Sequence, residues 1–223
     1  MSPAAETEAE PGAAEPKSFG LHIKGDAVFR IKDRTFGIAS AFLFAEIREV
    51  PQAQTMWGPR NEGIAWFLEV RTEENGANEP DGWEPYAECM CKFPKLHWQE
   101  IDGQVVEWGD SWDEEMGNPR GTLYLFNGCP IRHSRLAFRD RRKTEFHFRW
   151  EGLCDLFWIE DYRDNLELLI DGKSQFIGIA VYEKDLSKAW QMLAQFQNPA
   201  EFSQDAIATY AGGSTTTFKP KVE

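Results

Sequence analysis

Two stretches of the sequence concentrate residue types that could bind a ligand or take part in chemistry. One, Glu107 to Gly121, reads EWGDSWDEEMGNPRG and sets two tryptophans among five carboxylates. The other, Ile131 to Trp150, reads IRHSRLAFRDRRKTEFHFRW and holds the densest positive charge of the chain. Carboxylates could hold a metal ion, work as an acid and base pair, or attract a basic partner, whereas arginines and histidines suit an anion.

The acidic stretch does not match a calcium loop. Counted from Asp110, the third position is Trp112 and the sixth is Glu115, where an EF-hand requires an oxygen ligand and a glycine. A carboxylate pair for glycoside hydrolysis requires a separation that sequence does not reveal. A contact surface remains, because tryptophan is enriched at binding hot spots and carboxylates steer cationic partners. The predicted partner-binding residues are Trp108, Asp110, Trp112, Asp113, Glu114 and Glu115. The alternative is that the two indole rings fold back over the end of a sheet.

The basic stretch is predicted to be a β-hairpin turning at residues 140–142. Paired residue numbers would then sum to about 282, which places Leu136, Phe138, Phe146, Phe148 and Trp150 on a core face. The opposite face is cationic, so either carboxylates from another strand neutralise it or a phosphate or carboxylate ligand binds there. The residues of that anion site would be His133, Arg135, Arg139, His147 and Arg149. Its histidines could add acid and base capacity.

The remaining motifs do not indicate a reaction. Cys89 and Cys91 with the scattered Cys129 and Cys154 lack the paired short spacings of a zinc site, so we expect buried, reduced thiols and no metal or cofactor. A nucleophile elbow, a phosphate loop, a zinc-protease motif and a dinucleotide-binding motif are all missing from the sequence. These observations favour a protein that is not an enzyme, with catalysis by scattered residues as the alternative.

The elements that position these residues are predicted to be mainly strands. Short apolar runs alternate with turn residues, which indicates a mostly β fold of antiparallel strands in a sandwich, a partly closed barrel or one curved sheet. Asp102-Gly103 and Asp171-Gly172 are read as hairpin turns. Among the nine tryptophans, Trp66, Trp150 and Trp158 lie in strand-like runs and are expected in the core. The predicted strands lie near residues 21–23, 27–31, 41–49, 64–72, 86–92, 96–101, 104–107, 122–126, 132–139, 144–150, 153–159, 166–170 and 175–182.

Helix is expected only near the C-terminus. Asp185 can cap a short amphipathic helix that Asn198-Pro199 ends, and a weaker helix is predicted over residues 200–210. Residues 1–17, which lack aromatic and branched aliphatic side chains, are predicted to be a disordered acidic tail. Residues 18–212 are then a single domain and residues 213–223 a flexible tail.

Charge and hydropathy indicate the kind of partner. The chain has 223 residues and a net charge of −13, which disfavours nucleic acid and anionic membranes and favours basic proteins. It shows neither a secretory signal nor an apolar run that could cross a membrane, so we expect a cytoplasmic protein. The leading hypothesis is a non-catalytic, acidic interaction protein, either an adaptor or an inhibitor resembling immunity proteins, that binds a basic protein. The alternative is a small-ligand protein or enzyme that binds a phosphate or carboxylate on the cationic hairpin.

Overall fold

The computed structural model describes residues 27–48, 63–73, 83–93, 96–110, 112–113, 118–210 and 213–221. The predicted tail at residues 1–17 and the predicted strand at residues 21–23 lie outside these ranges. The strands are β1 (Val28–Ile31), β2 (Arg34–Phe36), β3 (Ile38–Ile47), β4 (Ile64–Thr72), β5 (Tyr86–Cys91), β6 (Val105–Trp108), β7 (Trp112–Asp113), β8 (Asn118–Pro119), β9 (Gly121–Leu125), β10 (Asn127–Pro130), β11 (Arg132–Arg142), β12 (Glu145–Cys154), β13 (Leu166–Val181), β14 (Phe202–Tyr210) and β15 (Gly213–Pro220). The helices are α1 (Leu186–Ala194) and the short 3-10 turns η1 (Trp98–Ile101), η2 (Glu160–Tyr162) and η3 (Pro199–Glu201).

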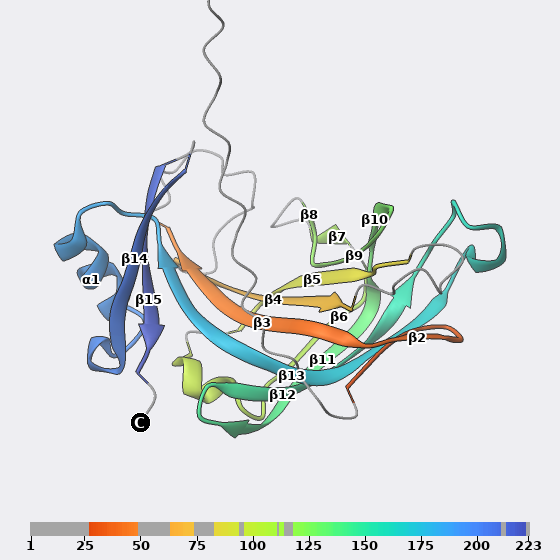
Figure 1. Cartoon of the computed structure of the whole chain (residues 1–223), viewed down its shortest axis with the longest axis horizontal. Helices are drawn as coiled ribbons and strands as arrows, with labels where there is room; N and C mark the ends of the chain where they lie inside the picture. Colours follow the sequence, from red (N-terminus) through yellow and green to blue (C-terminus); the bar gives the residue numbers. More distant parts are fainter. Residues whose placement is uncertain are drawn as a thin grey trace, which may run out of the picture.

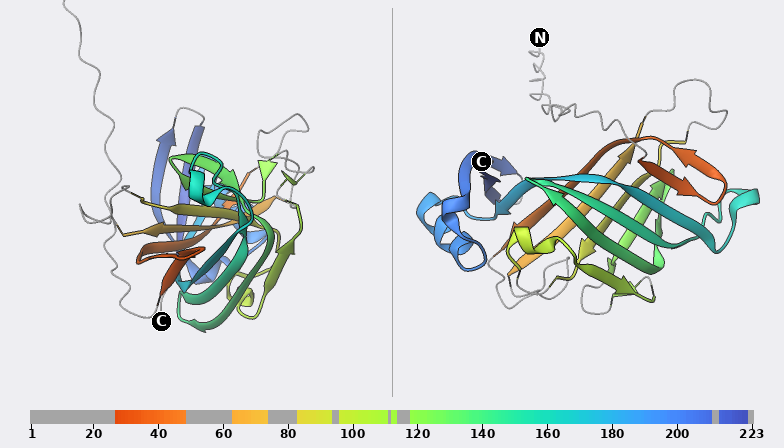
Figure 2. Two further views of the ribbon diagram at one scale, coloured as in Figure 1. Left: turned by 90° about the vertical axis from the view of Figure 1, so that its right-hand side faces the viewer. Right: turned by 90° about the horizontal axis from the view of Figure 1, so that it is seen from below.

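Thirteen strands form one sheet that curls into a half-barrel (Figures 1 and 2). Its main path runs β10-β9-β5-β4-β3-β13-β12-β11-β6, with β1 and β15 also paired to β13. The mostly β prediction is confirmed, and the curved sheet was among its alternatives. The expectation of antiparallel strands alone is wrong, because β13 and β3 pair in parallel.

The long strand β13 is the axis of this sheet. It runs without interruption from Leu166 to Val181, so the hairpin turn predicted at Asp171-Gly172 is wrong. Asp171 and Gly172 instead pair with Arg149 and Phe148 of β12, which shows that pairing with neighbouring strands outweighs the local turn preference. The turn predicted at Asp102-Gly103 is present, with Gly103 at a φ of 81°.

The inner face of the half-barrel carries an aromatic core. Trp66 lies 5.9 Å from Phe176 between ring centroids, and Trp98 stacks on the same phenylalanine at 5.1 Å. Trp66 and Trp150 are fully buried, as predicted, because alternate side chains of a strand point to the same face. Trp158 is a correction: the strand expected at residues 153–159 ends at Cys154, and the indole lies partly exposed in the loop that follows. Likewise, residues 96–101 contain η1 instead of a strand.

The C-terminal end differs most from the predictions. Helix α1 is present, and Asp185 caps it by accepting a hydrogen bond from the backbone N–H of Lys188 at 3.0 Å. The weak helix expected over residues 200–210 is wrong, because β14 occupies this region and pairs with β15. Within the segment predicted to be a flexible tail, residues 213–220 form β15, which also pairs with β13. Phe202 and Phe218 are buried, so their apolar area favours strands that join the core. Among the described residues, no helix has the length and hydropathy needed to span a membrane.

Candidate functional site

Among the described residues of the acidic stretch from Glu107, two of the predicted contact residues are buried. Trp108 lies in β6, is only 8% exposed, and donates from Nε1 to the carbonyl oxygen of Ile131 at 2.8 Å. Asp113 is also buried, and it forms ion pairs with Lys92 at 2.7 Å and with Arg120. Trp108 and Asp113 therefore act within the fold, contrary to the prediction. Trp112 is 58% exposed and Asp110 is also exposed, whereas Glu114 and Glu115 lie outside the described residues.

The basic stretch forms the predicted hairpin of β11 and β12, with the predicted core face. Leu136 pairs with Trp150 and Phe138 with Phe148, so the turn falls at Lys143 and Thr144, about two residues later than predicted. Because moving the turn by two residues changes each pairing by an even number, the same side chains stay on the inner face. All five residues predicted for the core face of the hairpin are buried: Leu136, Phe138, Phe146, Phe148 and Trp150.

Carboxylates of β12 itself and of the neighbouring strands pair with cations on the outer face of this hairpin. Arg149 bonds Glu151 at 2.6 Å and Asp171 of β13 at 3.1 Å, and these carboxylates raise its pKa. Arg135 pairs with Glu107 of β6 at 3.1 Å. The same Asp171 lies 2.6 Å from Nε2 of His147. Arg135, His147 and Arg149 thus each have a carboxylate partner in the protein itself.

The ring of His147 is held at both nitrogens. Arg139 donates from Nε to Nδ1 at 3.0 Å, which requires an unprotonated Nδ1. The other ring nitrogen, Nε2, lies within hydrogen-bond distance of Oδ1 of Asp171. A histidine engaged in this way does not have a free nitrogen to serve as a general base. The last predicted anion-site residue, His133, is exposed and lies at a φ of 47°.

The cysteines lie inside the fold. Cys89 and Cys91 point to the same side of β5, with their sulfur atoms 3.8 Å apart. Burial raises the pKa of Cys89, which keeps it protonated. Cys129 and Cys154 are also buried and free. In the described part of the chain, no group of three or more histidine, cysteine, aspartate or glutamate side chains is arranged to hold a metal.

Sequence reasoning missed a loop between β12 and β13, residues 155–165, which we call the η2 loop. Leu156 is fully buried and donates its backbone N–H to the carbonyl oxygen of Arg163 at 2.8 Å, which closes the loop. Tyr162 points inward, with its ring centroid 5.2 Å from that of Trp83. Its hydroxyl donates to Asp33, in the turn between β1 and β2, at 2.7 Å. The loop is therefore anchored to the body of the protein.

The base of the η2 loop is fastened as well. Asp155 pairs with Arg132 at 2.5 Å and accepts the backbone N–H of Asn165 at 2.7 Å. Partial burial opposes ionisation of Asp155, but these two donors hold its pKa below the usual value, so the carboxylate stays charged. Asn165 itself has a φ of 54°, a conformation that asparagine tolerates better than most residues. The apolar run FWI in this segment resembled a strand, whereas the following Asp and Asn residues are the signals that predict a turn.

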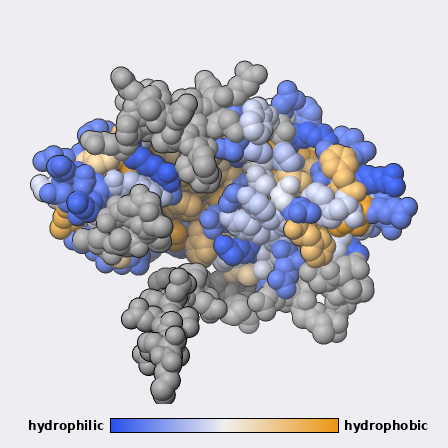
Figure 3. Space-filling model, turned by 90° about the horizontal axis from the view of Figure 1, so that it is seen from above, coloured by the Kyte–Doolittle hydropathy of each residue, from blue (hydrophilic) through white to orange (hydrophobic). Residues whose placement is uncertain are grey.

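These anchors leave two aromatic side chains at the surface. Phe157 is 68% exposed and Trp158 is 38% exposed. The end of the molecule opposite α1, on the right of Figure 3, shows separate hydrophobic residues among hydrophilic ones. Aromatic side chains supply large apolar area to a binding partner when they are exposed.

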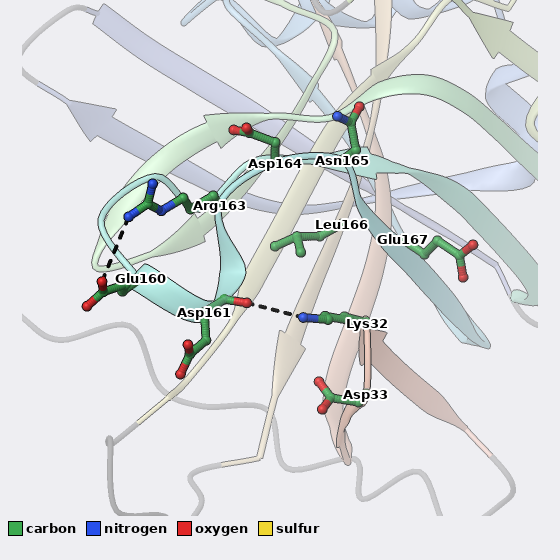
Figure 4. A pocket seen from close by; sticks show the side chains of 9 residues that line it. All are labelled: Lys32, Asp33, Glu160, Asp161, Arg163, Asp164, Asn165, Leu166 and Glu167. Carbon is green, nitrogen blue, oxygen red and sulfur yellow. Dashed lines mark hydrogen bonds and ion pairs between the residues drawn. The ribbon is translucent and has the colours of Figure 1, made fainter.

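An acidic pocket lies on the same loop (Figure 4). It has a volume of about 670 Å³ and is built from the β1–β2 turn, the η2 loop and the first residues of β13. Lys32 contributes one cation, and its Nζ donates a hydrogen bond to the carbonyl oxygen of Asp161 at 3.2 Å. The lining contains five carboxylates and two cationic side chains. Its residues are Lys32, Asp33, Glu160, Asp161, Arg163, Asp164, Asn165, Leu166 and Glu167. The pocket is therefore suited to a cationic group.

No known protein family, no characterised protein and no solved structure matches this chain.

Proposed function

We propose that this protein is a non-catalytic interaction protein, of the inhibitor or adaptor type, that binds a basic protein through the η2 loop. The observation that carries the proposal is the exposure of Phe157 and Trp158 on the η2 loop. In the sequence, these residues come shortly before the residues of that loop that line a pocket in which carboxylates outnumber cations. An aromatic anchor supplies apolar area for binding, and carboxylates attract a positively charged partner. The sequence led to this class of function, but to a different stretch of the chain.

The anchoring of the loop supports this proposal. Binding costs free energy when it orders side chains and loops, so a surface held in place before binding loses less. Leu156, Tyr162 and Asp155 hold the η2 loop through burial, a hydrogen bond and an ion pair. The two exposed rings thus lie on a fixed frame.

The net charge of the chain also supports a basic partner. At −13, the protein creates a negative field that speeds encounter with cationic proteins at low salt. The rival function, binding of an anion by the cationic hairpin, has weaker support because Arg135, Arg149 and His147 already have carboxylate partners.

The proposal is tested by comparing two exposed tryptophans. Wild-type protein, Trp158→Ala and Trp112→Ala are immobilised and exposed to a native lysate of the source cells, and retained proteins are quantified by mass spectrometry. We expect one basic protein to be retained by the wild type and by Trp112→Ala, and lost with Trp158→Ala. Equal retention by all three would show that the η2 loop is not the binding surface.

The kinetics of the purified pair then separate the two parts of the site. Trp158→Ala should act mainly on the dissociation rate, because a desolvated ring is lost only from the formed complex. Replacing Asp161 and Asp164 by asparagine should instead lower the association rate and weaken its salt dependence. If the asparagine variant associates at the wild-type rate at low salt, the acidic pocket does not steer the partner.

A further inference from the structure

A second cavity lies on the outer face of the sheet, away from the η2 loop. It has a volume of about 200 Å³ and opens over β3, β4, β5 and the segment 118–122. Pockets for drug-sized ligands measure roughly 300–1,000 Å³. This cavity therefore suits a single small group.

One side of the cavity is apolar. Phe44 of β3 and Phe67 of β4 are cross-strand partners whose rings stack at 5.2 Å between centroids with an angle of 17°. Met90 of β5 is the cross-strand partner of Phe67. These three side chains form a row on the outer face, and all three line the cavity.

The next row across the same strands is acidic. Glu69 of β4 and Glu88 of β5 are directly opposite each other and both line the cavity. Like charges in this position destabilise a sheet. Burial raises the pKa of Glu69, and the negative charge of Glu88 adds to that increase. Arg71 is the ion-pair partner of Glu69, with 3.9 Å between Nη2 of Arg71 and Oε2 of Glu69. Its guanidinium lies over the ring of Tyr86.

Glu88 is held by two phenol groups. Tyr86 donates to one carboxylate oxygen at 2.5 Å and Tyr124 donates to the other at 2.9 Å. Burial and the hydrogen bonds to Glu88 raise the pKa of Tyr86 and raise that of Tyr124 to about 12. Both phenols therefore keep their protons at neutral pH. These two donors define the position of the Glu88 carboxylate.

The cations at the cavity are engaged with other carboxylates. Arg48 bonds Glu46 at 2.6 Å, and its guanidinium lies over the ring of Tyr182. Arg120 forms an ion pair with Asp113. The facing pair Glu69 and Glu88 is therefore the part of the lining where negative charge is least compensated.

We propose that this cavity binds an alkylguanidinium group. Its planar fork would donate to the carboxylates of Glu69 and Glu88, and its alkyl stem would lie along Phe44, Phe67 and Met90. Guanidinium groups match carboxylates with several directed hydrogen bonds and also pack on aromatic rings. The positive charge of a bound alkylguanidinium group would offset the repulsion between Glu69 and Glu88. This site is separate from the η2 loop and does not depend on the proposed protein partner.

The test is a calorimetric titration of the full chain with butylguanidinium chloride. We expect saturable binding with one site per chain. Neutral butylurea has nearly the same shape without the charge and should not bind, and butylammonium should bind more weakly because it lacks the planar fork. Absence of saturable binding by butylguanidinium, or equal binding of either analogue, would overturn the proposal.

Two variants locate the site. Glu69→Gln should weaken binding about tenfold or more, the effect of losing a charged hydrogen bond. Its melting temperature should stay at or above that of the wild type, because a repulsive pair is removed, so loss of fold would not explain the result. Trp158→Ala, which alters the proposed protein-binding surface, should bind butylguanidinium as the wild type does. Unchanged affinity in Glu69→Gln would show that the cation binds elsewhere.

Discussion

Tyr162 donates a hydrogen bond to Asp33 at 2.7 Å, although 129 positions separate the two residues in the chain. The bond joins the η2 loop to the turn between β1 and β2, which together form the acidic pocket. Arg34 strengthens the same junction, with its guanidinium 4.1 Å from the ring centroid of Trp83 and 5.6 Å from that of Tyr162. The proposed binding surface therefore depends on a contact between distant segments.

Replacing Tyr162 by phenylalanine tests this junction. The hydrogen bond from Tyr162 lowers the pKa of Asp33 below its ordinary value of 3.8, so the stabilising effect of this bond is fully present above that pH. It is lost as the pH falls through the lower pKa of the folded state. The melting temperature of Tyr162→Phe should thus be below that of the wild type at pH 7, and the difference should shrink below pH 3.8. A difference that stays constant with pH would contradict this coupling.

The two tryptophans of the acidic stretch should respond differently to truncation. Trp108→Ala removes a buried ring whose centroid lies 6.0 Å from that of Trp150. This change should lower the free energy of unfolding by about 3–5 kcal/mol. Trp112→Ala removes an exposed ring and should change it by less than about 0.5 kcal/mol. Urea denaturation of both variants measures the contrast. Similar losses in the two variants would mean that Trp112 is also packed in the core.

The cationic hairpin should behave as an internally neutralised surface. Arg149→Ala should lower the free energy of unfolding by about 1 kcal/mol, a small value because the side chain is 41% exposed and solvent screens its ion pairs. Arg135→Ala, which removes a more exposed pair, should cost less. Phosphate should raise the melting temperature of the wild type only as much as chloride does at equal ionic strength. A specific stabilisation by phosphate that Arg149→Ala abolishes would instead support the anion site.

Gly178 allows β13 to meet β15. Its φ is 128°, and a Cβ atom there would lie 2.2 Å from the carbonyl oxygen of Phe218. Gly178→Ala should therefore cost roughly 3 kcal/mol or more, from backbone strain together with a clash against backbone atoms. Gly103→Ala is the matched control, because its φ is 81° but the space around it is open. That control should lose only about 1–2 kcal/mol, the cost of the backbone conformation alone. Equal losses would show that the close approach to Phe218 contributes little.

Several features could be predicted from the sequence because they depend on neighbouring residues. Alternation of apolar and polar side chains identified the strands and the inner face of the β11–β12 hairpin, since the side chains of a strand alternate between two faces. Asp185 likewise predicted the start of α1, because an N-terminal cap acts within one turn of helix. The acidic composition is also a property of the sequence alone, and the proposal of a basic partner rests on this net charge without knowledge of the fold.

Only the tertiary structure decided where charge and apolar area meet. Trp108 follows a glutamate and precedes a glycine in a polar stretch, yet it is buried because β6 pairs with β11 and brings it against Trp150. Trp158 lies in an apolar run, yet it is exposed because Leu156 and Tyr162 turn the chain back on itself. The acidic pocket and the Glu69–Glu88 pair each combine strands or turns distant in the chain. Burial and ion pairing depend on which segments become neighbours in space, and local sequence patterns do not specify those neighbours.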